Sequence, residues 1–165
     1  MILIVAGVAG SGKTTLGELI AGSLGWEFAD GDAFHSATNV AKMRSGRPLS
    51  DSDRWPWLAA IGAWMDDQIA KGQSAVVACS ALSRRYRDSL LSGRPEVCMV
   101  FLEISREQAH TRLHVRHGHF FGESMITSQF AELEPPEPGE RVLVIPAIGL
   151  PDQLAESVID QLQLD

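Results

Sequence analysis

The chain has 165 residues, the size of one ordinary domain, and 45% of them are hydrophobic, which excludes an intrinsically disordered chain. Its formal net charge of −7 argues against broad adhesion to nucleic acid or to anionic membranes, but leaves room for a local cleft that binds a small phosphorylated ligand. Cys79 and Cys98 form no CxxC pair, and no signal peptide or membrane span is readable, so we expect a cytoplasmic protein.

Short apolar runs alternate with segments of helical spacing along the chain. The runs predict strands at 2–6, 26–30, 74–78, 97–102 and 141–145. Apolar stripes and capping residues predict helices at 15–24, 50–72, 105–116 and 150–163. Because strands that alternate with helices build βαβ units, the sequence predicts an α/β fold in which helices cover both faces of a parallel sheet.

Residues 117–140 are irregular, beginning with HGHFFGES and ending with EPPEPGE. Long loops in a compact domain are commonly active-site lids. We therefore expect a single domain over 1–165 with a lid at about 116–138.

The segment GVAGSGKTT, residues 7–15, follows the first predicted strand and opens the first predicted helix. It satisfies GxxxxGK[ST], the pattern of a loop whose backbone N–H groups surround phosphate at a helix N-terminus. In this motif the lysine reaches the β- and γ-phosphates and the hydroxyl after it binds Mg²⁺, which assigns these roles to Lys13 and Thr14. The expected nucleotide contacts are Gly7, Gly10, Ser11, Gly12, Lys13, Thr14 and Thr15. The alternative is a chance glycine-rich turn with a surface lysine.

A phosphate-binding loop does not name the acceptor, because GTPases, motor ATPases and small-molecule kinases share it. The chain has no NKxD guanine signature and is too short for a motor with a transmission domain. A compact chain with a lid favours a small-molecule kinase, since a closed lid keeps water from the γ-phosphate.

Two acids follow the second predicted strand, in FADGDAFH. Ligands of open α/β sheets bind outside the carboxyl ends of the strands, so Asp30 and Asp32 are expected in the same crevice as the phosphate-binding loop. We assign Asp32 as the base for an attacking hydroxyl and Asp30 to the metal. The alternative is an Asp-Gly-Asp turn selected for its backbone conformation.

The motifs GVAGSGKTT, DGDAFH, NVAKMRSGRPLSDSDRWPWL, CSALSRRYRD and RLHVRHGHFF…SQFAELEPP resemble those of the small P-loop gluconate kinases, relatives of shikimate kinase and the nucleoside monophosphate kinases. The resemblance runs from Ile4 to about Glu140. It implies a P-loop NTPase fold with a five-stranded parallel sheet, transfer of phosphate from ATP to D-gluconate, and a homodimer as is frequent in the family. For this reaction we expect Mg²⁺ to be required for charge neutralisation.

D-Gluconate is a polyhydroxylated carboxylate, so its site should combine a base with cationic forks and polar groups. The expected substrate contacts are Asp32, His35, Arg54, Ser80, Ala81, Arg84 and His119. For His35 the alternative is an exposed or helix-capping histidine. At least one of Arg84, Arg85 and Arg87 should be solvated, because adjacent helical residues cannot all face one cleft. Ser83 stands where the family usually has lysine, and Arg84 is the candidate to replace it.

Arg112 and Arg116 lie four residues apart on one predicted helix face. By analogy with related kinases, Arg112 is assigned to the base of the nucleotide and Arg116 to the phosphates as a catalytic residue. The alternative is a solvated pair.

His117 and His119 lack the further ligands of a metal site. Pro146 stands where the family often has a polar residue. Trp55, Trp57 and Trp64 are expected to pack in the core or a dimer interface, and the alternative is a platform on which a sugar stacks.

Two further functions stay open at this stage. One is a kinase of shikimate or of another sugar acid, which would need different carboxylate contacts. The other is a nucleotide-binding switch that hydrolyses ATP without an acceptor.

Overall fold

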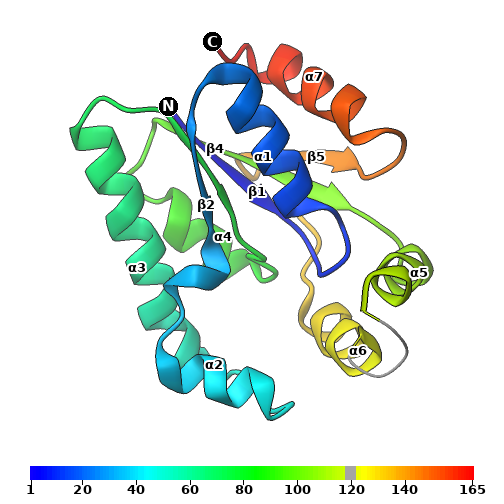
Figure 1. Cartoon of the computed structure of the whole chain (residues 1–165). Coiled ribbons are helices and arrows are strands. Elements are labelled where there is room, and N and C mark those ends of the chain that lie inside the picture. Colours follow the sequence, from blue (N-terminus) through cyan, green and yellow to red (C-terminus); the bar gives the residue numbers. More distant parts are fainter. Residues whose placement is uncertain (118–121) are drawn as a thin grey trace.

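Five parallel strands form one sheet in the part of the chain that the computed structural model describes, residues 1–117 and 122–165 (Figure 1). Side chains are described for these residues except 114–117, 122 and 123. The strand order is β2-β3-β1-β4-β5. The strands are β1 (Ile2–Ala6), β2 (Glu27–Asp30), β3 (Ala75–Ala78), β4 (Val97–Glu103) and β5 (Val142–Pro146). All five predicted strands are confirmed to within two residues, and so is the predicted fold class.

The first strand shows why the apolar runs were informative. Every residue of β1 is fully buried, because β3 and β4 flank it and helices cover both of its faces. Ile2 and Ile4 point into one core, and Leu3 and Val5 point into the other. A strand without a polar side must be apolar throughout.

Helices lie on both faces of the sheet (Figure 1). On one face α1 (Lys13–Leu24) packs against α7 (Pro151–Leu162), and both contribute to the same apolar cluster. On the other face lie α3 (Asp51–Ala70) and α4 (Arg84–Leu91). The helix pair α5 (Arg106–His117) and α6 (Gly122–Glu132) lies side by side beyond the carboxyl ends of β1 and β4 (Figure 1). None of the described helices is long and apolar enough to cross a membrane.

The short helix α2 (Ala37–Arg44) was not among the predicted elements. It follows a 3-10 turn, η1 (Gly31–Phe34), and has little apolar spacing. Its first turn is capped by Ser36, whose hydroxyl accepts from the backbone N–H of Asn39 at 3.1 Å. An ion pair of 2.7 Å joins Lys42 to Asp53 of α3. Capping and tertiary contacts therefore define this helix, and neither produces an apolar periodicity.

The segment predicted as a lid contains α6 and the chain that follows it. Residues 118–121 lie outside the described residues, so the lid stays a prediction. After α6 the chain is tied to the body of the protein, because Glu134 donates its N–H to the carbonyl of Leu82 at 3.0 Å.

A buried ion pair anchors the chain between α6 and β5. The guanidinium of Arg87 is fully buried and binds both carboxylate oxygens of Glu140, at 2.8 and 3.0 Å. It also donates to the backbone carbonyls of Leu82 and Glu134, at 3.0 and 2.9 Å. The hydrogen bond from Arg87 lowers the pKa of Glu140. One arginine thus joins the loop after β3 to the segment before β5.

Replacing Glu140 by glutamine should destabilise the fold by about 3–5 kcal/mol, because it leaves the buried charge of Arg87 without a counter-ion. Urea denaturation measures this difference. The control is Glu137→Gln, since Glu137 makes an exposed ion pair with Arg84 and should cost about 1 kcal/mol or less. Because folding lowers the pKa of Glu140, the ion pair contributes to the free energy of unfolding above the normal glutamate pKa. This contribution is lost as the pH falls from the normal value through the lowered one. A wild-type-like midpoint for E140Q would contradict this role.

Candidate functional site

The loop between β1 and α1 has the geometry of a phosphate cradle. The φ angles of three glycines in this loop are positive, a region that residues other than glycine rarely adopt. They are 137° for Gly7, 80° for Gly10 and 98° for Gly12. The N–H of Gly7 donates to the carbonyl of Ser80 at 3.2 Å, which ties the loop to the end of β3. The N-terminus of α1 opens directly at Lys13, so its dipole favours an anion in this loop.

Lys13 lies at the centre of the local electrostatics. Its ammonium donates to the carbonyl of Val8 at 3.0 Å, within its own loop. Burial lowers the pKa of Lys13, and the charges of Asp32 and Asp30 act in the opposite direction. The lysine and both acids are therefore within electrostatic range of one another at the strand ends, and their roles stay predictions. A cation beside two carboxylates suits a site of phosphate transfer, where the cation stabilises the charge on the transferring group.

The two acids are held in place by the turn between them. Asp30 ends β2, and one of its carboxylate oxygens accepts from the N–H of Asp32 at 3.0 Å. A side chain at Gly31 would overlap the carbonyl oxygen of Ala78, so glycine allows the turn to pack against β3. The Asp-Gly-Asp turn is thus both a backbone requirement and a means of bringing two carboxylates to the crevice.

Cys79 follows β3 at the same edge of the sheet. Burial raises the pKa of its thiol to about 12, with Lys13 acting to lower it. The thiol is therefore neutral at physiological pH. It adds no charge between Lys13 and the acids.

Asp32, His35 and Arg54 belong to one cluster on the acceptor side. Burial lowers the pKa of His35, Asp32 raises it and Arg54 lowers it, which puts all three within electrostatic range. The guanidinium of Arg54 binds the carboxylate of Glu132 on α6 at 2.7 Å. The predicted carboxylate-binding arginine is thus paired with a carboxylate of the protein itself.

The residues predicted around the end of β3 separate into two groups. Ser80 follows β3 and its carbonyl accepts from Gly7 of the phosphate-binding loop, and Ala81 is buried with a positive φ of 42°, so their substrate contacts stay predictions. Arg84 is exposed and faces Glu137 at 3.2 Å, and its backbone N–H donates to Glu134 at 2.6 Å. No structural observation links Arg84 to the Asp32 cluster, so its substrate contact stays a prediction.

Arg84, Arg85 and Arg87 do not all face one cleft, as predicted for adjacent residues of a helix. Arg85 is exposed and pairs with Asp51 at 2.6 Å. Arg87 is buried in its pair with Glu140. Ser83 is buried at the N-cap of α4, and its hydroxyl makes no side-chain hydrogen bond in the described structure. A hydroxyl is neutral, so it does not replace the charge of the family's lysine.

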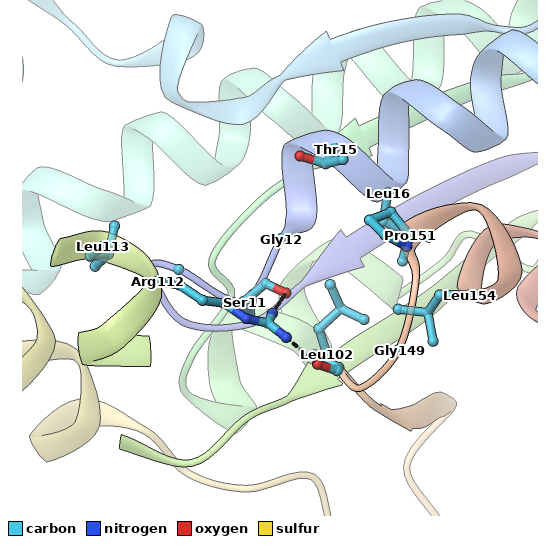
Figure 2. A pocket seen from close by; sticks show the side chains of 12 residues that line it. Ser11, Gly12, Thr15, Leu16, Leu102, Arg112, Leu113, Gly149, Pro151 and Leu154 are labelled. Carbon is cyan, nitrogen blue, oxygen red and sulfur yellow. Dashed lines mark hydrogen bonds between the residues drawn. The ribbon is translucent and has the colours of Figure 1, made fainter. Parts of the chain in front are cut away.

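A cavity of about 340 Å³ opens between the phosphate-binding loop and the chain after β5 (Figure 2). Arg112 reaches into it from α5 and donates to two carbonyls, Ser11 at 3.2 Å and Ala147 at 2.5 Å. Leu102, Pro151 and Leu154 supply apolar walls. An arginine above an apolar slot beside a phosphate cradle suits a nucleotide base, the role predicted for Arg112.

Two of the predicted residues cannot be placed. Arg116 lies within α5, but its side chain is outside the described residues, as is the whole of His119. Their predicted roles are therefore unchanged.

Sequence reasoning missed the contributions of α6 and α2. Gln129 of α6 accepts from the N–H of Ala9 in the phosphate-binding loop at 2.6 Å, and Glu132, one turn later, binds Arg54. Asn39 of α2 is buried beside His35. The signal for α6 was the motif SQFAELE, which contributed to the resemblance without suggesting individual roles.

Trp57 differs from a purely apolar core residue. Its ring stacks on His35 at 4.3 Å between centroids, and its indole N–H donates to the carbonyl of Gly31 at 2.7 Å. Trp55 is 40% exposed and lies edge-on to Tyr86. Trp57 therefore belongs to the wall of the acceptor cluster as well as to the core.

Comparison with known proteins adds family membership to this geometry. Residues 2–136 match the family described as AAA domain. A gluconokinase of Gluconobacter oxydans (strain 621H) is 41% identical, over 99% of this chain and 92% of its own length. Among solved structures, a gluconokinase from Sinorhizobium meliloti 1021 is 40% identical with a TM-score of 0.85, covering 97% of this chain and 91% of its own.

A more distant structure shares the fold alone. Shikimate kinase from Aquifex aeolicus is 16% identical with a TM-score of 0.56, covering 99% of this chain and 96% of its own. The similarity to gluconokinases is thus far greater in sequence than the similarity to this shikimate kinase.

Replacing Arg112 by methionine should weaken nucleotide binding about tenfold, because the guanidinium that spans the cavity is lost while the apolar stem is kept. Isothermal titration with a non-hydrolysable ATP analogue measures the dissociation constant. Arg106→Met is the control, since Arg106 lies on the same helix and binds only the hydroxyl of Thr127 in the described structure. Equal dissociation constants for R112M and R106M would remove Arg112 from the nucleotide site.

Proposed function

The chain belongs to the gluconokinase family of P-loop kinases, and on this premise we propose that it transfers the γ-phosphate of ATP to D-gluconate, giving ADP and 6-phospho-D-gluconate. The observation that carries the proposal is that the charge of Asp32 acts on the Lys13 ammonium, which lies within the phosphate-binding loop. Phosphate transfer to an alcohol requires a cation at the transferring phosphate and a carboxylate that can accept the proton of the hydroxyl.

Asp32 is the residue we assign to the acceptor hydroxyl. Its carboxylate accepts the proton of the terminal hydroxyl while the hydroxyl oxygen bonds to the γ-phosphorus and the bond to the ADP oxygen breaks. Lys13 neutralises charge on the transferring group, and the loop N–H groups hold the phosphates that remain on ADP. Arg116 is assigned to the same phosphates, on the resemblance alone.

The oxygen donors near the cradle fit a magnesium ion. Thr14 provides a hydroxyl and Asp30 a carboxylate whose second oxygen is left over from the turn bond to Asp32. Oxygen ligands of this kind are those that Mg²⁺ prefers. When bound with ATP, Mg²⁺ offsets part of the phosphate charge.

The acceptor would be recognised at both ends. Arg54 and His35 supply a cationic fork and an imidazole for the carboxylate and hydroxyls, and Ser80 and Ala81 border the path to the phosphate. Arg84 and His119 are further proposed contacts. Because Glu132 already binds Arg54, an incoming carboxylate must share or displace it.

The cellular setting follows from the family and the charge. We propose a cytoplasmic homodimer that acts on a small molecule, with no nucleic-acid partner, since the net charge of −7 disfavours polyanions.

Asp32→Asn should lower kcat by about 10²- to 10⁴-fold while ATP affinity stays within a few-fold of wild type, because only proton acceptance is lost. ADP release in a coupled assay, with and without gluconate, measures transfer and idle hydrolysis separately. Asp67→Asn, at an exposed ion pair of α3, is the control. If D32N phosphorylated gluconate at near-normal rates, another group would be the base.

Arg54→Met should raise the KM for gluconate about tenfold or more and leave the KM for ATP unchanged, because a charge-assisted fork to the carboxylate is removed. Initial rates over both substrates measure the two constants, with shikimate as a competing acceptor. The matched control is Arg85→Met, since Arg85 also stacks near Tyr86 but is exposed. An unchanged gluconate KM in R54M would exclude Arg54 from the acceptor site.

A further inference from the structure

A buried amide contacts the histidine of the acceptor cluster. Asn39 is 5% exposed, and its side-chain nitrogen lies 2.9 Å from the carbonyl oxygen of Asp53 and 3.3 Å from Nδ1 of His35. None of the proposed binding or transfer roles uses Asn39. Its two contacts nevertheless determine the chemistry of the imidazole.

The orientation of the Asn39 amide follows from its partner on α3. A backbone carbonyl can only accept a hydrogen bond, so the amide atom next to Asp53 must be the nitrogen and not the oxygen. That nitrogen carries two hydrogens and donates one of them to Asp53. The second hydrogen is available to His35.

The protonation of His35 follows in turn. The Asn39 nitrogen only donates, so Nδ1 of His35 must accept, and it can accept only if it carries no proton. A neutral imidazole with a bare Nδ1 has its proton on Nε2. The ring is thereby fixed as a hydrogen-bond donor at Nε2.

The ring is also fixed in orientation. It stacks on Trp57 with an interplanar angle of 14°, and Trp57 is itself held by its bond to Gly31, the residue before Asp32. His35 borders an open cavity of about 780 Å³ beside α2. Within the described residues, Asn39 is the one hydrogen-bond partner of the imidazole ring, so Nε2 is left for a ligand.

We propose that Asn39 is a positioning residue that holds His35 as the neutral Nε2–H tautomer, so that the ring donates a hydrogen bond to an oxygen of the sugar acid. The part that concerns the acceptor rests on the proposed function. A neutral donor suits hydroxyl oxygens as well as a carboxylate, and it leaves the proton-accepting role to Asp32.

The charges around the ring bear on its neutral state. Burial lowers the pKa of His35, the carboxylate of Asp32 raises it and the guanidinium of Arg54 lowers it. The neutral form is therefore present at physiological pH and is lost as the pH falls through the lowered pKa.

The first test is spectroscopic and needs no activity. Nitrogen-detected NMR of protein labelled in its histidine rings, with His35→Gln to assign the signals, should show at pH 7 a protonated Nε2 and an unprotonated Nδ1. In Asn39→Asp the new carboxylate can only accept, so the proton should move to Nδ1 or the ring should become cationic, and the pKa should rise by about 1 unit or more. A wild-type ring protonated at Nδ1 would overturn the proposal.

The second test separates positioning from a structural role. Asn39→Leu should raise the gluconate KM about fivefold or more with the ATP KM unchanged, and it should add nothing further in a His35→Ala background. Lys42→Met is the matched control, because it breaks the other tie between α2 and α3 without touching His35. An equal effect of N39L with and without His35, or the same effect in K42M, would show that Asn39 only supports the fold.

Failure of the proposed function would give a different result. If the wild-type protein released no extra ADP with gluconate, both the function and the acceptor role of His35 would fall. The tautomer would still be decided by the NMR measurement, which is also available if N39L does not fold.

Discussion

The parallel sheet imposes the constraint on which the site depends, because all of its strands end at one edge. Lys13 opens α1 after the loop that follows β1, Asp30 ends β2 with Asp32 in the next turn, and Cys79 and Ser80 follow β3. The backbone bond between Gly7 and Ser80 and the close packing of Gly31 on β3 keep these three segments together. The groups proposed for the phosphate donor and for the acceptor are therefore held together at this edge of the sheet.

The helix α6 connects the two halves of this site. Gln129 binds the phosphate-binding loop at Ala9, and Glu132 binds Arg54 on the acceptor side. Just after the helix, the carboxylate of Glu134 accepts from the N–H of Arg84 at the start of α4, and its backbone carbonyl accepts from the buried Arg87. The region predicted as a lid therefore has a firmly attached C-terminal part, and movement of the whole region as one body would break contacts on three sides.

Sequence reasoning succeeded where a single local rule determines the structure. The strands were predictable because buried parallel strands are apolar throughout, and the proximity of Lys13, Asp30 and Asp32 was predictable because topology gathers strand ends. The helix α2 was not, since caps and an ion pair define it. Gln129 and Asn39 look like residues of solvated helix faces until their partners are known, and Ala9 is 120 positions from Gln129. The ion pair between Arg54 and Glu132 was not predicted either.

The pairing of Arg54 with Glu132 affects which anions can bind the guanidinium. A tethered carboxylate acts at a high effective concentration, so chloride or inorganic phosphate gains little by competing for the guanidinium. A ligand must bring additional contacts to make the exchange favourable. Glu132 thus disfavours the binding of simple anions to Arg54. Only a molecule that contacts several groups at once offsets the free energy of displacing Glu132.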